Sequence, residues 1–322
     1  MGALPEMLSL TVCRTEYEKR HVNEVKFEKR LHVFGSACHL VASGSDMNNT
    51  DPLELAEGEF TRLEAKFASF RPDSVIASIN AAAGTGKPTP LDAEARSLFS
   101  YVNALWGQSN HVFDPSIRVL LGCYSPEGKL IATPEQLQAT LKLVGWSGLE
   151  IGSRGALLSQ EGMAINLDSC IRPYAVDSVR KILIKAGVTN ALIDLDQDVA
   201  SIGRQPDGAN WLVGARHPKG QRTAFTRFKL NDRGYSLRGN FEHRMTIENE
   251  CYGRALSPVD GQPLPGLLSV AIIADNCLTA CSAANIARLK TEKAALLWLE
   301  KLGLPWMAVD RQLVCHGPLA PA

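Results

Sequence analysis

The sequence predicts an α+β fold with mixed and antiparallel sheets and flanking helices. Apolar residues recur at helical spacing in several segments, short apolar runs typical of strands lie between them, and the two kinds of segment do not alternate regularly. The chain has 322 residues, 45% of them hydrophobic, which is sufficient for one large domain or two closely packed lobes. We expect residues 1–30 to form a loosely docked arm or an edge hairpin, and residues 31–322 to form a single domain of two intimate lobes.

The composition argues against several classes of partner. The chain carries 34 basic and 34 acidic residues and no basic block, so we expect neither nucleic acid nor an anionic membrane surface as a partner. No apolar run is long enough to span a bilayer, and the first residues include Glu6 and lack a basic leader, which is untypical of a signal peptide. We therefore expect a cytoplasmic protein. The eight cysteines are scattered, unlike a disulfide framework.

We expect a strand and three helices in the first half of the chain. The segment from Leu31 to Ser43 resembles a strand interrupted by Gly35. A helix begins after Asp51, which is a suitable N-cap before Pro52, and a second begins near Asp92. Thr133 and Gln136 have the spacing of a capping box for the third. The expected buried positions of the first two helices are Ala56, Phe60, Leu63, Phe67, Ala95, Leu98, Phe99, Val102 and Trp106.

The segment from Ala164 to Gly203 is the most informative stretch. It predicts a helix with Pro173 in its first turn and Gly187 at its end, followed by a buried strand over Ala191–Leu195. On a continuous strand, Asp194, Asp196 and Asp198 would share one face. This acidic row is either part of a ligand cradle that could hold a cation or an ordinary solvated strand edge.

The last third predicts further strands and one long helix. We expect strands at Trp211–Arg216, Phe225–Leu230, Met245–Asn249, Leu267–Ala274, Met307–Val309 and Gln312–Cys315. The segment from Arg254 to Gly266 is rich in proline and glycine and indicates a long loop. The helix covers about residues 279–302, with a break near residues 290–292.

Six short segments, in order along the chain, resemble motifs of one family. They are Ser69-Phe70-Arg71-Pro72-Asp73-Ser74 with Asn80, His111-Val112-Phe113-Asp114-Pro115, Pro173-Tyr174-Ala175-Val176-Asp177, Asp194-Leu195-Asp196-Gln197-Asp198, the run from Trp211 to Pro218, and Pro258 with Gly261. Together they are similar to the FAD:protein FMN transferases, the ApbE-type flavin transferases. The resemblance covers roughly residues 33–310.

The resemblance implies a fold of two interwoven lobes with FAD bound in the cleft between them. In the family, a magnesium ion lies on the pyrophosphate, and FMN is passed to a Ser or Thr hydroxyl of a target flavoprotein. The residues that it implies for flavin binding here are Phe34, Gly35, Ser36, Phe70, Asn80, Asp114, Arg172, Tyr174, Asp177, Asp196, Gln197, Pro258 and Gly261. Phe70 would either stack on a flavin or adenine ring or be buried, and Asn80 and Asp114 would either contact ligand or tie turns.

The sequence departs from the family pattern at the positions of the chemistry. Aligned through Glu292, the family's A-D-x-x-x-T metal segment places Ala280 at its Asp and Ala284 at its Thr, and a methyl group cannot coordinate magnesium. Its His falls on Arg254, a poor general base. The Lys before its tyrosine falls on Arg172, and its two glycines fall on Asp196 and Gln197.

These departures predict a diverged member that binds FAD or FMN but has lost or weakened magnesium-dependent transfer, with no metal ligands assigned. If transfer occurs, Arg172 and Arg254 would replace the magnesium, and Asp198 or Asp260 would activate the acceptor hydroxyl. The alternatives are an active FMN transferase with relocated metal ligands, and a flavin carrier, sensor or partner-binding pseudoenzyme without catalysis.

Overall fold

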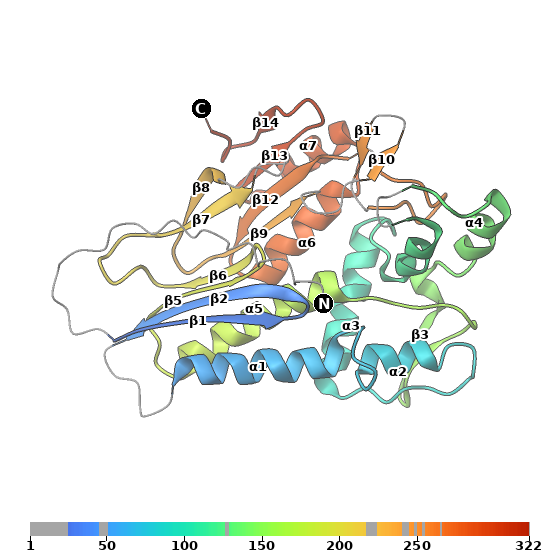
Figure 1. Cartoon of the computed structure of the whole chain (residues 1–322), viewed down its shortest axis with the longest axis horizontal. Helices are drawn as coiled ribbons and strands as arrows, with labels where there is room; N and C mark the ends of the chain where they lie inside the picture. Colours follow the sequence, from blue (N-terminus) through green and yellow to red (C-terminus); the bar gives the residue numbers. More distant parts are fainter. Residues whose placement is uncertain are drawn as a thin grey trace, which may run out of the picture.

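A computed structural model describes residues 25–44, 51–125, 129–216, 224–239, 245–247, 250–252, 255–264 and 266–321. Its centre is an eight-stranded sheet in which every neighbouring pair is antiparallel (Figure 1). The fold is therefore α+β, as the sequence predicts. The strands lie in the spatial order β1 (Val25–Val33), β2 (Ser36–Gly44), β5 (Asn190–Leu195), β6 (Asp198–Ile202), β9 (Gly234–Gly239), β12 (Ser269–Ala274), β13 (Trp306–Val309) and β14 (Cys315–His316).

Each face of the sheet has its own cover. Helices pack on one face, and the hairpin of β7 (Trp211–Arg216) and β8 (Ala224–Leu230) packs on the other through Trp211, Val213 and Phe228. Because both faces are covered, β6 and β12 are buried along their whole length. The covering helices are α1 (Pro52–Phe67), α5 (Asp168–Lys185), α6 (Cys277–Arg288) and α7 (Glu292–Lys301).

A second group of elements lies beside the sheet and its helices (Figure 1). It has a small apolar cluster of its own, in which Leu120, Tyr124 and Leu137 pack with Leu256 of a later loop. The group consists of α2 (Val75–Ala81), α3 (Ala93–Gln108), the 3-10 helices η1 (Pro115–Cys123) and η2 (Trp146–Gly148), α4 (Pro134–Leu141), β3 (Leu149–Gly152) and β4 (Gly155–Leu158), with the hairpin β10 (Met245–Ile247) and β11 (Glu250–Tyr252) nearby.

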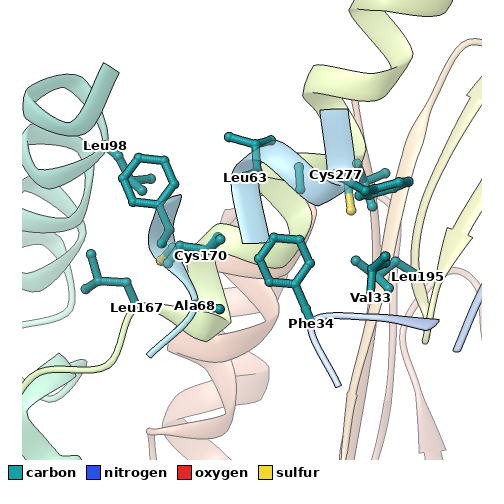
Figure 2. Close-up of a cluster of buried hydrophobic side chains, with 14 of the residues drawn as sticks. Val33, Phe34, Leu63, Ala68, Leu98, Leu167, Cys170, Leu195 and Cys277 are labelled. Carbon is teal, nitrogen blue, oxygen red and sulfur yellow. The ribbon is translucent and has the colours of Figure 1, made fainter. Parts of the chain in front are cut away.

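The largest apolar cluster joins the helices to the sheet (Figure 2). Leu63 of α1 and Cys170 of α5 pack there with Leu195 of β5 and with Phe34, at the turn between β1 and β2. The predicted core positions of α1, namely Ala56, Phe60, Leu63 and Phe67, are fully buried. Those of α3 are buried as well, except for Trp106, which is half-buried.

Most of the predicted helix ends are confirmed. The Asp51 carboxylate accepts the Leu53 N–H at 2.8 Å at the start of α1. Thr133 and Gln136 form the predicted capping box of α4. The long C-terminal helix is broken where we expected it, since α6 ends at Arg288 and α7 begins at Glu292. Gly187 follows α5 with a positive φ of 87°, as a helix C-terminus favours.

The position predicted for Pro173 is wrong. Helix α5 begins at Asp168, five residues before this proline, so Pro173 lies inside the helix. The helix starts early because the Asn166 side chain accepts the Asp168 N–H at 2.7 Å. Proline has no N–H for the Ser169 carbonyl one turn earlier. The Cys281 thiol of α6 donates to that carbonyl at 3.1 Å and replaces the missing bond.

The acidic row on a continuous strand is also wrong. The chain reverses at Asp196 and Gln197, which form the two-residue turn between β5 and β6, and Leu195 pairs with Asp198. Asp194 accepts the Gln197 N–H at 3.0 Å within this turn. The three carboxylates therefore do not form one ladder.

The predicted N-terminal arm overlaps a strand. Residues 25–30 belong to β1, which forms one edge of the large sheet, and residues 1–24 lie outside the described residues. Within the described part of the chain, no helix combines the length and the apolar character that crossing a membrane requires.

Candidate functional site

A cavity of about 440 Å³ opens between the end of the large sheet and the η1 region. This volume is within the range of about 300–1,000 Å³ that is typical of small-molecule sites. Five arginines and two aspartates are among its described lining residues. The polar and charged residues of the lining are Asp114, Arg118, Asn166, Ser169, Arg172, Asp196, Gln197, Arg216, Arg238, Asn285 and Arg288.

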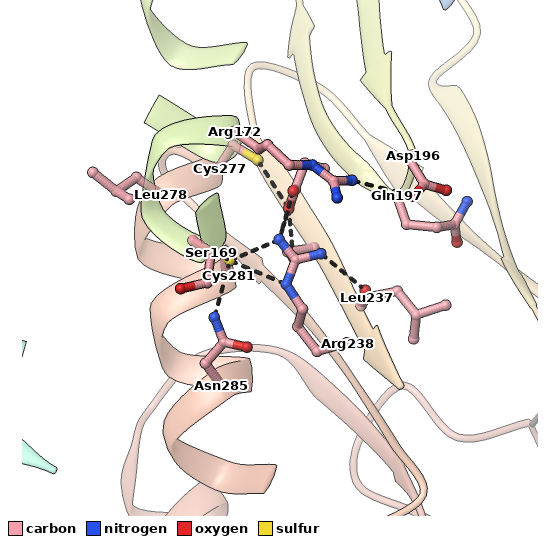
Figure 3. A network of polar contacts seen from close by, with 12 residues as sticks. Ser169, Arg172, Asp196, Gln197, Leu237, Arg238, Cys277, Leu278, Cys281 and Asn285 are labelled. Atoms are coloured by element: carbon pink, nitrogen blue, oxygen red, sulfur yellow. Dashed lines mark hydrogen bonds and ion pairs between the residues drawn. The ribbon is translucent and has the colours of Figure 1, made fainter. Parts of the chain in front are cut away.

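Arg238, near the end of β9, is a cation of the cavity lining with several polar partners (Figure 3). Its Nη2 donates to both carboxylate oxygens of Asp198, at 2.6 and 2.5 Å, and to Cys281 Sγ at 2.8 Å. The hydroxyl of Ser236 donates to the same Asp198 carboxylate at 2.8 Å. Asp198 is fully buried, so this pairing supplies the charge compensation that a buried carboxylate requires.

The close approach of β9 to α6 brings this group together. A Cβ atom on Gly234 would lie 2.1 Å from the backbone carbon of Asn276, so only glycine fits at the start of β9. From there, Tyr235 and Leu237 alternate toward the β7–β8 hairpin, while Ser236 and Arg238 point to the helix side. Strand alternation thus delivers the guanidinium of Arg238 to the cavity.

Burial shapes the ionisation of the groups around Arg238. Burial is the largest single influence and opposes the charge of Arg238, but the charges and hydrogen bonds of Asp198 and Cys281 together outweigh it, so the pKa of Arg238 lies above its usual value. Burial, with the charge of Arg238 close by, lowers the pKa of Arg288 to about 10. Burial raises the pKa of Cys281 to about 11 despite the neighbouring Arg238, which keeps the thiol protonated at neutral pH.

The turn between β5 and β6 carries a carboxylate into the cavity. Asp196 accepts Arg172 Nη2 and Arg216 Nη2, one on each carboxylate oxygen, at 3.2 Å each. Asp196 and Gln197 have positive φ values of 49° and 72°. Such two-residue turns favour Asn and Gly, so side chains here occupy backbone positions that glycine would take without strain.

Buried polar atoms without a hydrogen-bond partner among the described residues include Arg172 Nε, a donor, and Gln197 Oε1, an acceptor. Gln197 is buried, with 9% of its surface exposed, and both residues line the cavity. Buried polar atoms without partners carry a desolvation cost, which a polar ligand in the cavity would remove.

Helix α6 turns the two alanines that we aligned with the metal segment away from the cavity. Ala280 and Ala284 pack in the apolar cluster between α6 and the sheet, on the side away from the cavity. Asn285 lines the cavity, and Cys281 lies behind the lining, where its Sγ contacts Arg238. The residues of α6 that point this way are therefore a protonated thiol and a carboxamide, not two methyl groups.

Magnesium does not fit this group of residues. It prefers oxygen ligands with at least one carboxylate, whereas α6 contains no acidic residue and both oxygens of Asp198 are bonded to Arg238. Among the described residues, no group of three or more His, Cys, Asp or Glu side chains could hold a metal ion. The positive charge at this place belongs to the protein itself.

Four of the residues predicted to bind flavin line the cavity, namely Asp114, Arg172, Asp196 and Gln197. Asp114 also ties turns, because its carboxylate accepts the Ser116 N–H at 2.8 Å and the Trp146 N–H at 2.9 Å. Asp198, predicted as a base, lies directly behind the lining and is bonded to Arg238.

The other predicted residues are not among the cavity's described lining. Asn80 bonds both backbone groups of Ile165, Tyr174 donates to Glu94, and Asp177 accepts the N–H groups of Cys277 and Leu278 at the start of α6. Phe34, Gly35 and Ser36 lie at the turn between β1 and β2, and Phe70 is 55% exposed.

The predicted residues of the long loop divide into two groups. Pro258, Asp260 and Gly261 are described, and Asp260 accepts the Gln262 N–H at 3.0 Å. Gly261 packs against the apolar cluster of η1 and α4, where Tyr124 donates to its carbonyl at 2.8 Å. Arg254 lies outside the described residues.

Sequence reasoning missed Arg118, Arg216, Arg238, Arg288, Cys281 and Asn285 as site residues. Strand β9 was not predicted, although the apolar Tyr235 and Leu237 alternate with the polar Ser236 and Arg238, a period typical of a strand. That alternation is the signal that would have assigned Arg238 to the polar side. For Arg118 and Arg288, no sequence pattern indicates that they face the same cavity.

Comparisons with known proteins agree with this architecture. The sequence is 21% identical to the FAD:protein FMN transferase of Klebsiella pneumoniae over 224 residues, which are 66% of this chain and 63% of that protein. The structure is similar to the ApbE protein of Thermotoga maritima, with a TM-score of 0.80 and 22% identity over 91% of this chain and 97% of that one. It is equally similar to the apo flavinyl transferase ApbE of Pseudomonas stutzeri, with a TM-score of 0.79 and 23% identity over 91% and 95% of the two chains. The sequence model of the ApbE family matches residues 34–307, and the chain therefore belongs to the ApbE family.

Proposed function

We propose that this protein binds a flavin nucleotide in the arginine-lined cavity and that magnesium-dependent transfer of FMN is lost or weakened. The family and the similarity to FAD:protein FMN transferases support the choice of FAD and FMN as ligands. The observation that carries the second half of the proposal is the Arg238–Asp198–Cys281 contact, which fills the metal segment with a guanidinium.

The cavity suits an anionic nucleotide. Guanidinium groups match phosphate oxygens in two-pronged geometry, and the lining brings Arg172, Arg216 and Arg238 to one space. The unpartnered Arg172 Nε and Gln197 Oε1 add a donor and an acceptor for a ligand. A flavin nucleotide offers both kinds of partner, on its phosphates and on its ring.

Transfer requires more than binding. The acceptor hydroxyl must lose its proton while its oxygen bonds to the FMN phosphorus and AMP leaves with the bridging oxygen. Asp198, which we expected to act as a base, is already bonded to Arg238 and Ser236. Since α6 has no carboxylate that could hold a metal ion, we expect FAD to bind without being split.

Calorimetric titration with FAD, in magnesium and in EDTA, tests the binding half of the proposal. AMP release from FAD, followed by chromatography with and without magnesium, tests the transfer half. We expect binding in both buffers and little AMP release in either. The transferase of Klebsiella pneumoniae serves as the positive control for AMP release. No FAD binding in either buffer, or release that matches the control once magnesium is added, would contradict the proposal.

A further inference from the structure

We propose that the cavity holds a diphosphate group directly through its arginines, without a divalent cation, and that Asp196 occupies the anion position until the ligand arrives. The inference rests on the proposed function because it concerns the same cavity, and it names the contacts that replace the metal. The ligand class is an organic or inorganic diphosphate.

Asp196 has the position of a replaceable anion. A single carboxylate holds Arg172 and Arg216 together, at 3.2 Å from each guanidinium, and its side chain is 25% exposed in the cavity. The turn that carries it has two residues with positive φ, where glycine would be free of strain. Retaining a carboxylate at this place keeps the two guanidinium groups converged on one point.

Arg238 has a different part in the same site. Its hydrogen bonds to Asp198 and Cys281 fix the guanidinium at the wall of the cavity beside α6. It lies within the same cavity lining as Arg172 and Arg216. A fixed cation and a pair of cations held by an exchangeable carboxylate together provide donors for the several oxygens of a diphosphate.

The first experiment measures the affinity of the full chain for inorganic pyrophosphate, FAD and FMN by titration, each in EDTA and each in magnesium. We expect pyrophosphate and FAD to bind in EDTA, with an FAD affinity within about twofold of that in magnesium, and pyrophosphate to compete with FAD. FMN, with a single phosphate, should bind about tenfold more weakly than FAD, because it engages fewer arginines. Binding of pyrophosphate without binding of FAD would support a diphosphate site whose ligand is inorganic, and it would contradict the proposed binding of flavin.

Charge variants separate the anion position from the rest of the cavity. Asp196→Asn removes the competing charge, and because Asn tolerates positive φ, the turn is kept. We expect pyrophosphate affinity to rise about tenfold. Arg172→Gln and Arg216→Gln should each lower it about tenfold or more.

Matched controls lie outside the lining. Asp232 also has a positive φ, 52°, and is paired with an arginine, Arg180, so Asp232→Asn should leave the affinity within twofold. Arg233 is paired with Asp275 on the exposed surface, and Arg233→Gln should likewise leave the pyrophosphate affinity within twofold.

Outcomes distinguish this inference from the proposed function. If FAD binds in EDTA but pyrophosphate does not compete and the Asp196 and arginine variants leave its affinity unchanged, flavin binding stands and the diphosphate assignment is overturned. Binding of either diphosphate only in the presence of magnesium would overturn it as well. If a single variant fails to fold, the titrations of the unmodified chain in EDTA still decide the question.

Discussion

Two groups of charged side chains in the described part of the chain, one between helices and one at the cavity, differ in how their arginines are balanced. One group joins α1, α3 and α5, where Arg62 bonds Glu59 and Glu94 and Lys66 bonds Asp92 and Glu94. Its described members are two cations and three carboxylates. The cavity instead has five arginines and two aspartates in its described lining.

The α1 group is structural. In the α1 group, every carboxylate accepts from a cation, and Tyr174 and Ser178 donate to Glu94 and Glu59 as well. The group holds three helices together without a ligand. In the cavity, Arg172 Nε and Gln197 Oε1 have no partner among the described residues. We infer that the first group is complete in itself and that the second is arranged for an anion.

The largest expected effect concerns the buried contact of the cavity group. Arg238→Met leaves the fully buried Asp198 carboxylate without its cation, and breaking a buried pair in this way costs about 3–5 kcal/mol. We expect that loss in the free energy of unfolding, measured by urea denaturation at pH 7.

The double variant Arg238→Met/Asp198→Asn is the control for that change. It removes the charge as well as its partner, so much of the lost stability should return. If Arg238→Met loses less than about 1 kcal/mol, other groups compensate the charge of Asp198. Arg238 would then not be the residue that balances the buried charge of the cavity group.

The sequence predicted the elements of the fold better than the contacts of the site. Periodic apolar positions and caps located α1, α3 and α4, because local rules determine them. The motifs identified four residues that line the cavity, namely Asp114, Arg172, Asp196 and Gln197. The register of α6 needed its packing against the sheet, since Ala280 and Cys281 are both small residues on one helix. The core contacts of Ala280 show that Cys281, and not Ala280, is the one that points toward Arg238.

A smaller effect is a difference in how stability depends on pH near the cavity and in the α1 group. Burial raises the pKa of Asp194, beside the cavity turn, to about 6. A carboxyl in the unfolded chain titrates near 4, so between about pH 4 and 6 the folded state holds a proton that the unfolded state has lost. Stability from this group therefore falls as pH rises through that window, by up to about 1 kcal/mol per pH unit.

Glu94 in the α1 group has the opposite sign. The hydrogen bonds from Arg62 outweigh burial and lower the pKa of Glu94 to about 2, so its contribution is present above about pH 4.5 and is lost toward pH 2. Urea denaturation across pH 2–7 tests both signs. Asp194→Asn should remove the fall in stability as pH rises from 4 to 6, and Glu94→Gln should remove the fall in stability as pH drops below 4.5. Identical pH profiles for the variant and the unmodified chain would contradict the assignment.

The smallest expected effect tests whether the α1 group is structural only. Arg62 is nearly half exposed, so its ion pairs with Glu59 and Glu94 are partly screened by solvent, and Arg62→Met should cost about 1 kcal/mol in the free energy of unfolding. Because Arg62 is not among the cavity's described lining residues, FAD and pyrophosphate affinities should stay within twofold of the unmodified chain. Arg216→Gln, measured in the same titrations, should show the reverse pattern, with little change in stability and a large loss of affinity. If Arg62→Met weakens ligand binding as much as Arg216→Gln does, the two groups are coupled through α5, and the division between a structural and a binding group fails.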